Sequence, residues 1–105
     1  TADRPPELRD CGAAQTIRQP QLFGRHVKWE TELLTPGGGV PDEAHARAVA
    51  CRAVAIARRE PAGPVHLNLP FREPLVADGD WSFARARDAA DTPFTAVAEP
   101  RLVAA

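Results

Sequence analysis

The 105-residue chain contains no methionine, and no apolar run in it approaches the roughly 18 residues that a membrane span requires. It also lacks the charged and then apolar start that is typical of a signal peptide. The missing methionine means that the chain does not include its own start residue. We therefore expect an internal part of a longer protein, located in the cytoplasm and without a membrane-spanning helix.

Cysteine is scarce as well, since Cys11 and Cys51 are the only two and stand far apart. Two distant cysteines do not make a metal site. A single disulfide and two free thiols both fit their number, and we expect two free thiols in a cytosolic chain. The 13 basic and 14 acidic residues give a net charge of −1. This balance offers no general attraction for nucleic acid or an anionic membrane.

Proline and glycine residues separate the chain into a few predicted secondary-structure elements. Residues 1–24 lack a long periodicity and are predicted to be loop with short turns. Residues 27–33 alternate apolar and polar side chains, which predicts a strand with one covered face. Residues 42–59 are predicted to form an alanine-rich helix, which Pro41 and two carboxylates open and which carries arginines at its end. Residues 65–69 are predicted to be a second strand.

A helix followed by a short turn and a strand is half of a βαβ unit. We therefore predict an α/β fold with a mainly parallel sheet and flanking helices, incomplete within this chain. Residues 1–76 would form one part of a domain, and residues 77–105 a linker towards a further domain. The isolated aromatic residues Trp81 and Phe83 would pin that linker to the surface.

Several short motifs in residues 1–76 carry a family resemblance. They are Thr-Ala-Asp-Arg-Pro-Pro-Glu-Leu at 1–8, Gly-Ala-Ala-Gln-Thr-Ile at 12–17, Gln19, Leu-Phe-Gly at 22–24 and Gly-Pro-Val-His-Leu-Asn-Leu-Pro-Phe-Arg-Glu-Pro-Leu at 63–75. In this order and spacing they resemble the menaquinone-pathway synthases that make 2-succinyl-5-enolpyruvyl-6-hydroxy-3-cyclohexene-1-carboxylate. The Gly-Pro-Val before an apolar strand and proline is shared across the thiamine-diphosphate superfamily. The Asp-Arg-Pro with Gly-Ala-x-Gln-x-Ile, and the Phe-Arg-Glu-Pro-Leu ending, are the specific parts.

The resemblance implies a fold and a reaction. The chain would be the later half of a pyrimidine-binding domain, and the linker would lead to the central domain. The parent enzyme would use thiamine diphosphate and Mg²⁺ to decarboxylate 2-oxoglutarate and add the product to isochorismate. Its active site would be shared between subunits of a homo-oligomer, and neither nucleic acid nor a membrane would take part.

The resemblance also indicates two site residues. Arg4 matches a substrate-side arginine and would clamp a carboxylate bidentately. Gln15 matches a glutamine that meets the substrate or the cofactor-bound intermediate, where an amide can donate to a developing oxyanion. On the residues alone, a surface arginine and a loop glutamine are the simpler interpretations. Ala14 stands where many relatives carry asparagine, so any side-chain bond from that position is absent.

Catalytic and metal-binding residues are expected to lie outside this chain. The family's glutamate that bonds the aminopyrimidine precedes the region covered here, and its magnesium and diphosphate motif follows in a later domain. We therefore expect the chain to bind no cofactor and to be inactive alone. Two alternatives stay open: the same domain of an acetolactate-synthase-like enzyme or decarboxylase, and a stand-alone interaction module.

The remaining polar and aromatic residues suggest no site by their spacing. His66 and Asn68 lie on the strand face opposite the apolar residues, which is common in sheets. Histidines 26 and 45 have no partner at catalytic or metal spacing. Phe23 and Trp29 are predicted to belong to the core.

Overall fold

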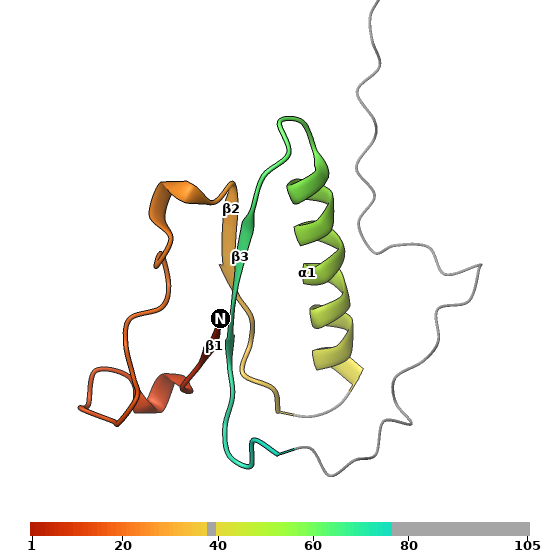
Figure 1. The fold of residues 1–105 in the computed structure, drawn as a ribbon. Coiled ribbons are helices and arrows are strands. Elements are labelled where there is room, and N and C mark those ends of the chain that lie inside the picture. Colours follow the sequence, from red (N-terminus) through yellow and green to blue (C-terminus); the bar gives the residue numbers. More distant parts are fainter. Residues whose placement is uncertain (38–39, 77–105) are drawn as a thin grey trace, which may run out of the picture.

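The computed structural model describes residues 1–37 and 40–76 and shows an α/β fold built on a parallel sheet (Figure 1). The three strands follow the order β1-β3-β2, and both pairings are parallel. The α/β class and the parallel sheet predicted from the sequence are confirmed. The predicted linker at 77–105, with Trp81 and Phe83, lies outside the described residues. In chain order the elements are β1 (Ala2–Asp3), the 3₁₀ helices η1 (Pro6–Leu8) and η2 (Gly24–His26), β2 (Trp29–Glu32), α1 (Val40–Arg58) and β3 (Val65–Pro70).

Helix α1 forms where proline, acidic and basic residues mark its two ends. Pro41 lies in its first turn, followed by Asp42 and Glu43, and Arg58 lies in its last turn. Carboxylates near the N-terminus and cations near the C-terminus both complement the helix dipole. The C-terminus receives a further cation, because Lys28 Nζ donates to the carbonyls of Ile56 at 2.7 Å and Arg59 at 2.5 Å. The predicted helix is confirmed, with its start two residues earlier and its end one residue earlier.

The N-terminal segment is more ordered than its sequence pattern predicted. Residues 1–24 were expected to be loop, yet they contain β1 and η1. Strand β1 pairs with the end of β3, with Ala2 opposite Leu69 and Asp3 opposite Pro70. Two residues are too few to display strand periodicity, and the pairing partner lies more than sixty residues away. Only the tertiary structure therefore defines this strand.

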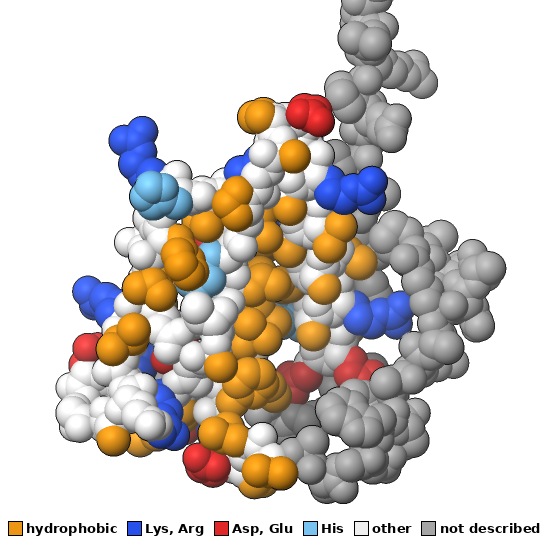
Figure 2. Space-filling view, in the orientation of Figure 1, with side chains coloured by type: hydrophobic (Ala, Val, Ile, Leu, Met, Phe, Trp, Pro, Cys, Tyr) orange, Lys and Arg blue, Asp and Glu red, His pale blue; other side chains and the backbone are white. Residues whose placement is uncertain are grey.

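The two faces of the sheet have different coverings (Figure 1). Helix α1 lies on one side, and the chain from β1 to β2 lies on the other. Figure 2 shows apolar side chains gathered along the junction of the sheet with α1. Even so, among the described residues the buried apolar side chains are only Ala53 and the prolines Pro5 and Pro70. So little buried apolar surface supplies only a small part of the stability that a domain needs.

The polar face of β3 is the better buried one. His66 is 4% exposed and Asn68 is 2% exposed, whereas the apolar residues of the opposite face are only half-buried. A buried polar face requires hydrogen-bonding partners for its side chains. Polar residues on one strand face are common in sheets, and the sequence pattern did not predict that the N-terminal segment covers them.

The two aromatic residues expected in the core lie nearer the surface. Phe23 is 43% exposed and meets the ring of His66 edge-on at 4.8 Å, so its placement in the core is wrong. Phe23 is the residue directly before η2, a short helix with no buried residue. Trp29 is half-buried, and the guanidinium of Arg52 lies 5.0 Å from its ring centre. That cation–π contact ties α1 to β2.

Candidate functional site

Arg4 and Gln15, the two residues singled out from the sequence, lie next to each other. Arg4 follows β1 directly, and its Nη2 donates to Gln15 Oε1 at 3.3 Å. Its other terminal nitrogen, Nη1, lies 3.6 Å from Glu73 Oε1. The Arg4 side chain is 30% exposed and that of Glu73 is 72% exposed. The guanidinium is thus held in place by two contacts and still meets solvent.

The loop that carries Gln15 has an unusual backbone. Gln15 has a φ of +56°, and Asp10 and Gln21 have φ values of +56° and +62°. Residues other than glycine reach this left-handed region at a cost of roughly 1–2 kcal/mol each. Gly12, at +75°, occupies it without that cost. Such conformations persist only where surrounding contacts impose them.

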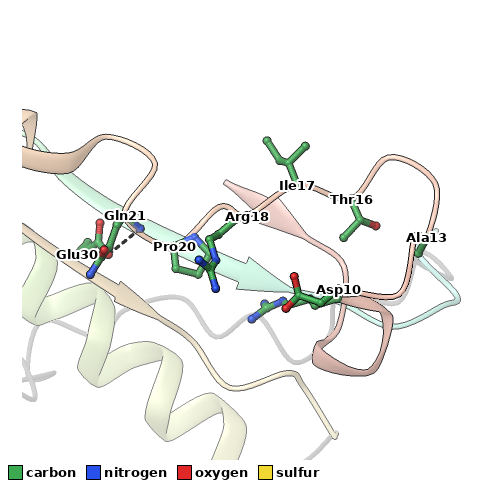
Figure 3. Close-up of a pocket in the computed structure, with 10 residues that line it drawn as sticks. Asp10, Ala13, Thr16, Ile17, Arg18, Pro20, Gln21 and Glu30 are labelled. Atoms are coloured by element: carbon green, nitrogen blue, oxygen red, sulfur yellow. Dashed lines mark hydrogen bonds between the residues drawn. The ribbon is translucent and has the colours of Figure 1, made fainter.

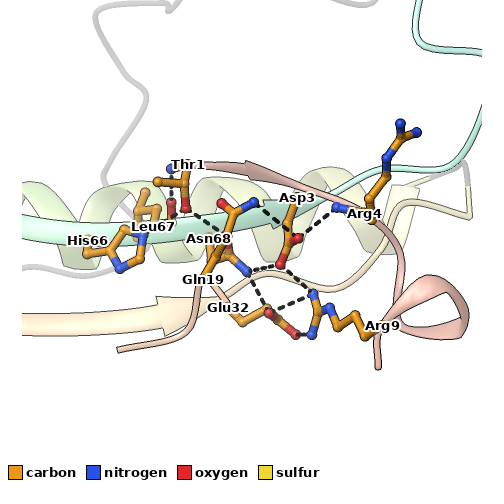
Figure 4. Close-up of polar contacts among 9 residues, drawn as sticks. All are labelled: Thr1, Asp3, Arg4, Arg9, Gln19, Glu32, His66, Leu67 and Asn68. Carbon is orange, nitrogen blue, oxygen red and sulfur yellow. Dashed lines mark hydrogen bonds and ion pairs between the residues drawn. The ribbon is translucent and has the colours of Figure 1, made fainter. Parts of the chain in front are cut away.

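A buried carboxylate forms the centre of a group of polar contacts (Figure 4). The side chain of Asp3 is 0% exposed. Its Oδ1 accepts from the Arg4 backbone nitrogen at 2.7 Å and from Gln19 Nε2 at 3.2 Å. Its Oδ2 accepts from Asn68 Nδ2 at 2.8 Å and lies 3.0 Å from Arg9 Nη2. Four donors therefore surround one carboxylate, which satisfies the requirement for a buried charge.

Asn68 links this carboxylate to β2. Its Nδ2 also donates to Glu32 Oε2 at 2.7 Å, and its Oδ1 accepts from Thr1 Oγ1 at 2.7 Å. Arg9 completes the group with a two-pronged bond to Glu32, at 3.0 Å from Nη1 and 2.9 Å from Nη2. We call Asp3, Arg9, Gln19, Glu32 and Asn68 the Asp3 cluster. It joins all three strands to both ends of the loop that carries Gln15.

Pairing between Arg9 and Glu32 in the Asp3 cluster shifts the pKa of both groups. The hydrogen bonds from Arg9, with a further one from Asn68, lower the pKa of the Glu32 carboxyl, although burial and the neighbouring Asp3 oppose the shift. The hydrogen bonds to Glu32 raise the pKa of the Arg9 guanidinium against the opposing effect of burial. Both shifts favour the ionised pair.

A second polar group surrounds His66 on the same face. Its Nε2 lies 2.8 Å from Thr1 Oγ1, and its Nδ1 lies 3.7 Å from Glu30 Oε2. Glu30 Oε1 in turn accepts from the Gln21 backbone nitrogen at 2.9 Å. Sequence reasoning had set His66 and Asn68 aside. The sequence signal that could have indicated them is the alternation of polar residues in β2, at 30 and 32, and in β3, at 66 and 68.

An open hollow of about 630 Å³ lies beside the loop (Figure 3). Gln21 and Glu30 stand at one end of it, and Ala13 and Thr16 at the other. Arg4 and Gln15 are not among the residues that line it. We therefore base the candidate site on the Arg4–Gln15 pair, which carries defined polar contacts, rather than on the hollow.

Metal and membrane features are both absent from the described part of the chain. No group of three or more histidine, cysteine or acidic residues in residues 1–37 and 40–76 is arranged to hold a metal ion. Over the same ranges, no helix combines the length and apolar character needed to cross a bilayer. Cys11 and Cys51 are both free thiols, as expected.

Comparison with known proteins gives one consistent result. The chain is 54% identical over 103 residues to a 2-succinyl-5-enolpyruvyl-6-hydroxy-3-cyclohexene-1-carboxylate synthase of Chloroflexus aurantiacus, a match that covers 95% of the chain. It is 51% identical over 94 residues to the synthase of the same name from Geobacillus thermodenitrificans, covering 89% of the chain. The chain is homologous to one segment of these synthases. The family resemblance expected from its motifs is thereby confirmed.

The same comparisons define how much of a synthase the chain represents. It spans 16% of the length of both the Chloroflexus and the Geobacillus synthase. A synthase of Lysinibacillus sphaericus is 55% identical over 78 residues, which cover 74% of the chain and 14% of that relative. No protein-family model matches the chain.

Proposed function

We propose that the chain is the later half of the pyrimidine-binding domain of a synthase in menaquinone biosynthesis. The parent enzyme decarboxylates 2-oxoglutarate and joins the resulting succinyl unit to isochorismate. The observation that carries the proposal is the 3.3 Å contact between Arg4 and Gln15, in a chain homologous to these synthases. The two family-matched residues come from separate segments, and the fold brings them together.

The geometry of this pair suits an anionic substrate. Both substrates carry carboxylates, and the planar guanidinium of Arg4 can bind one with two parallel hydrogen bonds. Its present partner Glu73 is largely exposed, and exposed ion pairs contribute little, so a substrate carboxylate can replace it at small cost. Because Gln15 accepts through Oε1, its Nε2 hydrogens are the donors that remain for a substrate oxygen.

The cofactor of the parent enzyme is proposed to be thiamine diphosphate with Mg²⁺, which supplies the electron sink for decarboxylation. The residues described here do not form a place for the metal, because they offer no ligand cluster. Other segments of the enzyme, and other subunits of a cytoplasmic homo-oligomer, would hold the diphosphate and the ion. The role of this chain is confined to binding and orienting substrate through Arg4 and Gln15.

The test compares the whole enzyme with residues 1–105 expressed alone. Carbon dioxide release from 2-oxoglutarate is measured with thiamine diphosphate and Mg²⁺, with and without isochorismate. The whole enzyme should form the succinyl adduct of isochorismate, and the chain alone should show no turnover. Turnover by the chain alone would refute the proposal that this chain only binds and orients substrate. A whole enzyme that used pyruvate in place of 2-oxoglutarate would favour the acetolactate-synthase-like alternative.

A further inference from the structure

The Asp3 cluster is more elaborate than the stability of a short sheet requires. It joins a carboxylate on the edge strand β1, with 0% side-chain exposure, to an asparagine on the central strand β3, with 2% exposure. Buried ionic groups often stabilise no more than well-packed apolar side chains of similar volume would. A polar centre of this kind can instead define one particular arrangement of the segments it joins.

The donors to Asp3 come from the segments that carry the candidate site. One is the backbone nitrogen of Arg4 itself, at 2.7 Å. Two others, Arg9 and Gln19, stand immediately outside the loop at 10–18, which contains Gln15. The carboxylate therefore fixes the backbone of one site residue and closes the base of the loop that presents the other.

The fourth donor anchors the carboxylate to the sheet. Asn68 lies in the central strand β3 and donates to Asp3 Oδ2 at 2.8 Å. In Figure 4 the Arg4 guanidinium points away from the cluster, while its backbone nitrogen faces Asp3. Arg4 is thus held through its main chain, and its charged group is directed outward.

We infer that Asp3 is a positioning residue, and that its bonds to Gln19, Arg9 and the Arg4 backbone set the distance between the Arg4 guanidinium and the Gln15 amide. This inference rests on the proposed function, in which that pair binds a substrate carboxylate. The strained backbone of Gln15, at a φ of +56°, agrees with a conformation imposed from the loop base. Opening the base would let Gln15 relax and move away from Arg4.

Gln19 is the best point at which to test the inference. Its single bond to Asp3, at 3.2 Å, lies at the edge of the cluster, so its removal leaves the carboxylate with three donors. In the whole synthase, Gln19→Ala should lower kcat/KM by about tenfold, because small misplacements of binding groups cost factors of this order or more. Gln19→Glu keeps the side-chain length and places a carboxylate against Asp3, so its loss should be at least as large.

A double-mutant cycle separates positioning from a general structural role. If Gln19 acts through Gln15, then Gln19→Ala should reduce kcat/KM by less than about twofold in a Gln15→Ala background. Cys11→Ser is the matched control, because Cys11 is an exposed residue of the same loop. Its kcat/KM and melting temperature should stay at wild-type values.

The kinetics and melting temperatures of these variants distinguish positioning from a structural role and from failure of the proposed function. An equal loss from Gln19→Ala in both backgrounds, in step with a lower melting temperature, would overturn the inference in favour of a structural role. Wild-type kinetics for both Gln19 variants, with a clear loss for Gln15→Ala, would also overturn it while leaving the proposed function intact. If Gln15→Ala and Arg4→Ala themselves had no effect, the proposed function would fail instead.

Discussion

Removal of the Arg4 side chain is the most informative single perturbation of the candidate site. Arg4→Ala takes away a guanidinium that is 30% exposed and that contacts Gln15 and the exposed Glu73. Neither contact belongs to the buried Asp3 cluster, and the backbone nitrogen of residue 4 keeps its bond to Asp3. We therefore expect the fold to change little and the loss to appear in catalysis.

The size of that loss follows from the exposure of the site. A charge-assisted two-pronged bond to a carboxylate is worth on the order of 2–4 kcal/mol when enclosed, and partial exposure places Arg4 towards the lower half. A loss of roughly 2–3 kcal/mol corresponds to about a 30- to 150-fold lower kcat/KM. Arg4→Lys should recover only part of this, because an ammonium cannot form the planar fork.

Steady-state kinetics of the whole enzyme, with each substrate varied in turn, would measure the effect. Arg72→Ala is the matched control: Arg72 is an exposed arginine paired with Glu7, with Nη2 3.0 Å from Oε2. It should retain wild-type kcat/KM. Equal kcat/KM for wild type and Arg4→Ala would refute the carboxylate clamp. A loss that only followed a lower melting temperature would assign Arg4 a structural role.

Three further predictions concern the scaffold and can be measured by hydrogen exchange of the whole enzyme. Lys28→Ala removes two hydrogen bonds to carbonyls at the C-terminal end of α1 and should speed exchange in its last turn about fivefold, from roughly 1 kcal/mol of lost capping; unchanged exchange would contradict this role. Asn68→Ala removes one donor from Asp3 and one from Glu32 and should cost about 2–3 kcal/mol, seen as lost protection in β1 and β3. Retained protection would show these two bonds to be dispensable. The pKa of Glu32 is lower in the folded state than in the unfolded state. The ionised Glu32 carboxylate therefore stabilises the fold above its unfolded pKa, and this stabilisation is lost as the pH falls through its folded pKa. Protection around β2 should therefore fall on acidification more steeply in wild type than in Glu32→Gln, and identical pH profiles would rule out this contribution.

The regular elements could be predicted from the sequence because their signals are local. Helix α1 has proline and two acidic residues at its start and arginine at its end, and β3 alternates apolar and polar side chains between two prolines. Strand β1 could not be predicted, since its two residues are defined by pairing with β3 rather than by a pattern of their own.

The candidate site was only partly accessible to sequence reasoning. Resemblance indicated Arg4 and Gln15, and the structure brings them within 3.3 Å. Asp3 and Asn68, which hold them, lie in motifs of the resemblance, and Asn68 also lies in the alternating polar positions of β3, but no local pattern predicted the bond between the two. Their roles arise because the N-terminal segment folds over the polar face of the sheet, a contact between positions 65 residues apart.

A segment exchange tests the central claim most directly. This chain would replace its counterpart in the Chloroflexus aurantiacus synthase, to which it is 54% identical over 103 residues. If the chain is the same working part of such an enzyme, the chimera should keep kcat/KM for isochorismate within about tenfold of the parent, and Arg4→Ala within it should lower that value further. A chimera that folds and assembles like the parent but forms no product, or that is indifferent to Arg4→Ala, would contradict the claim.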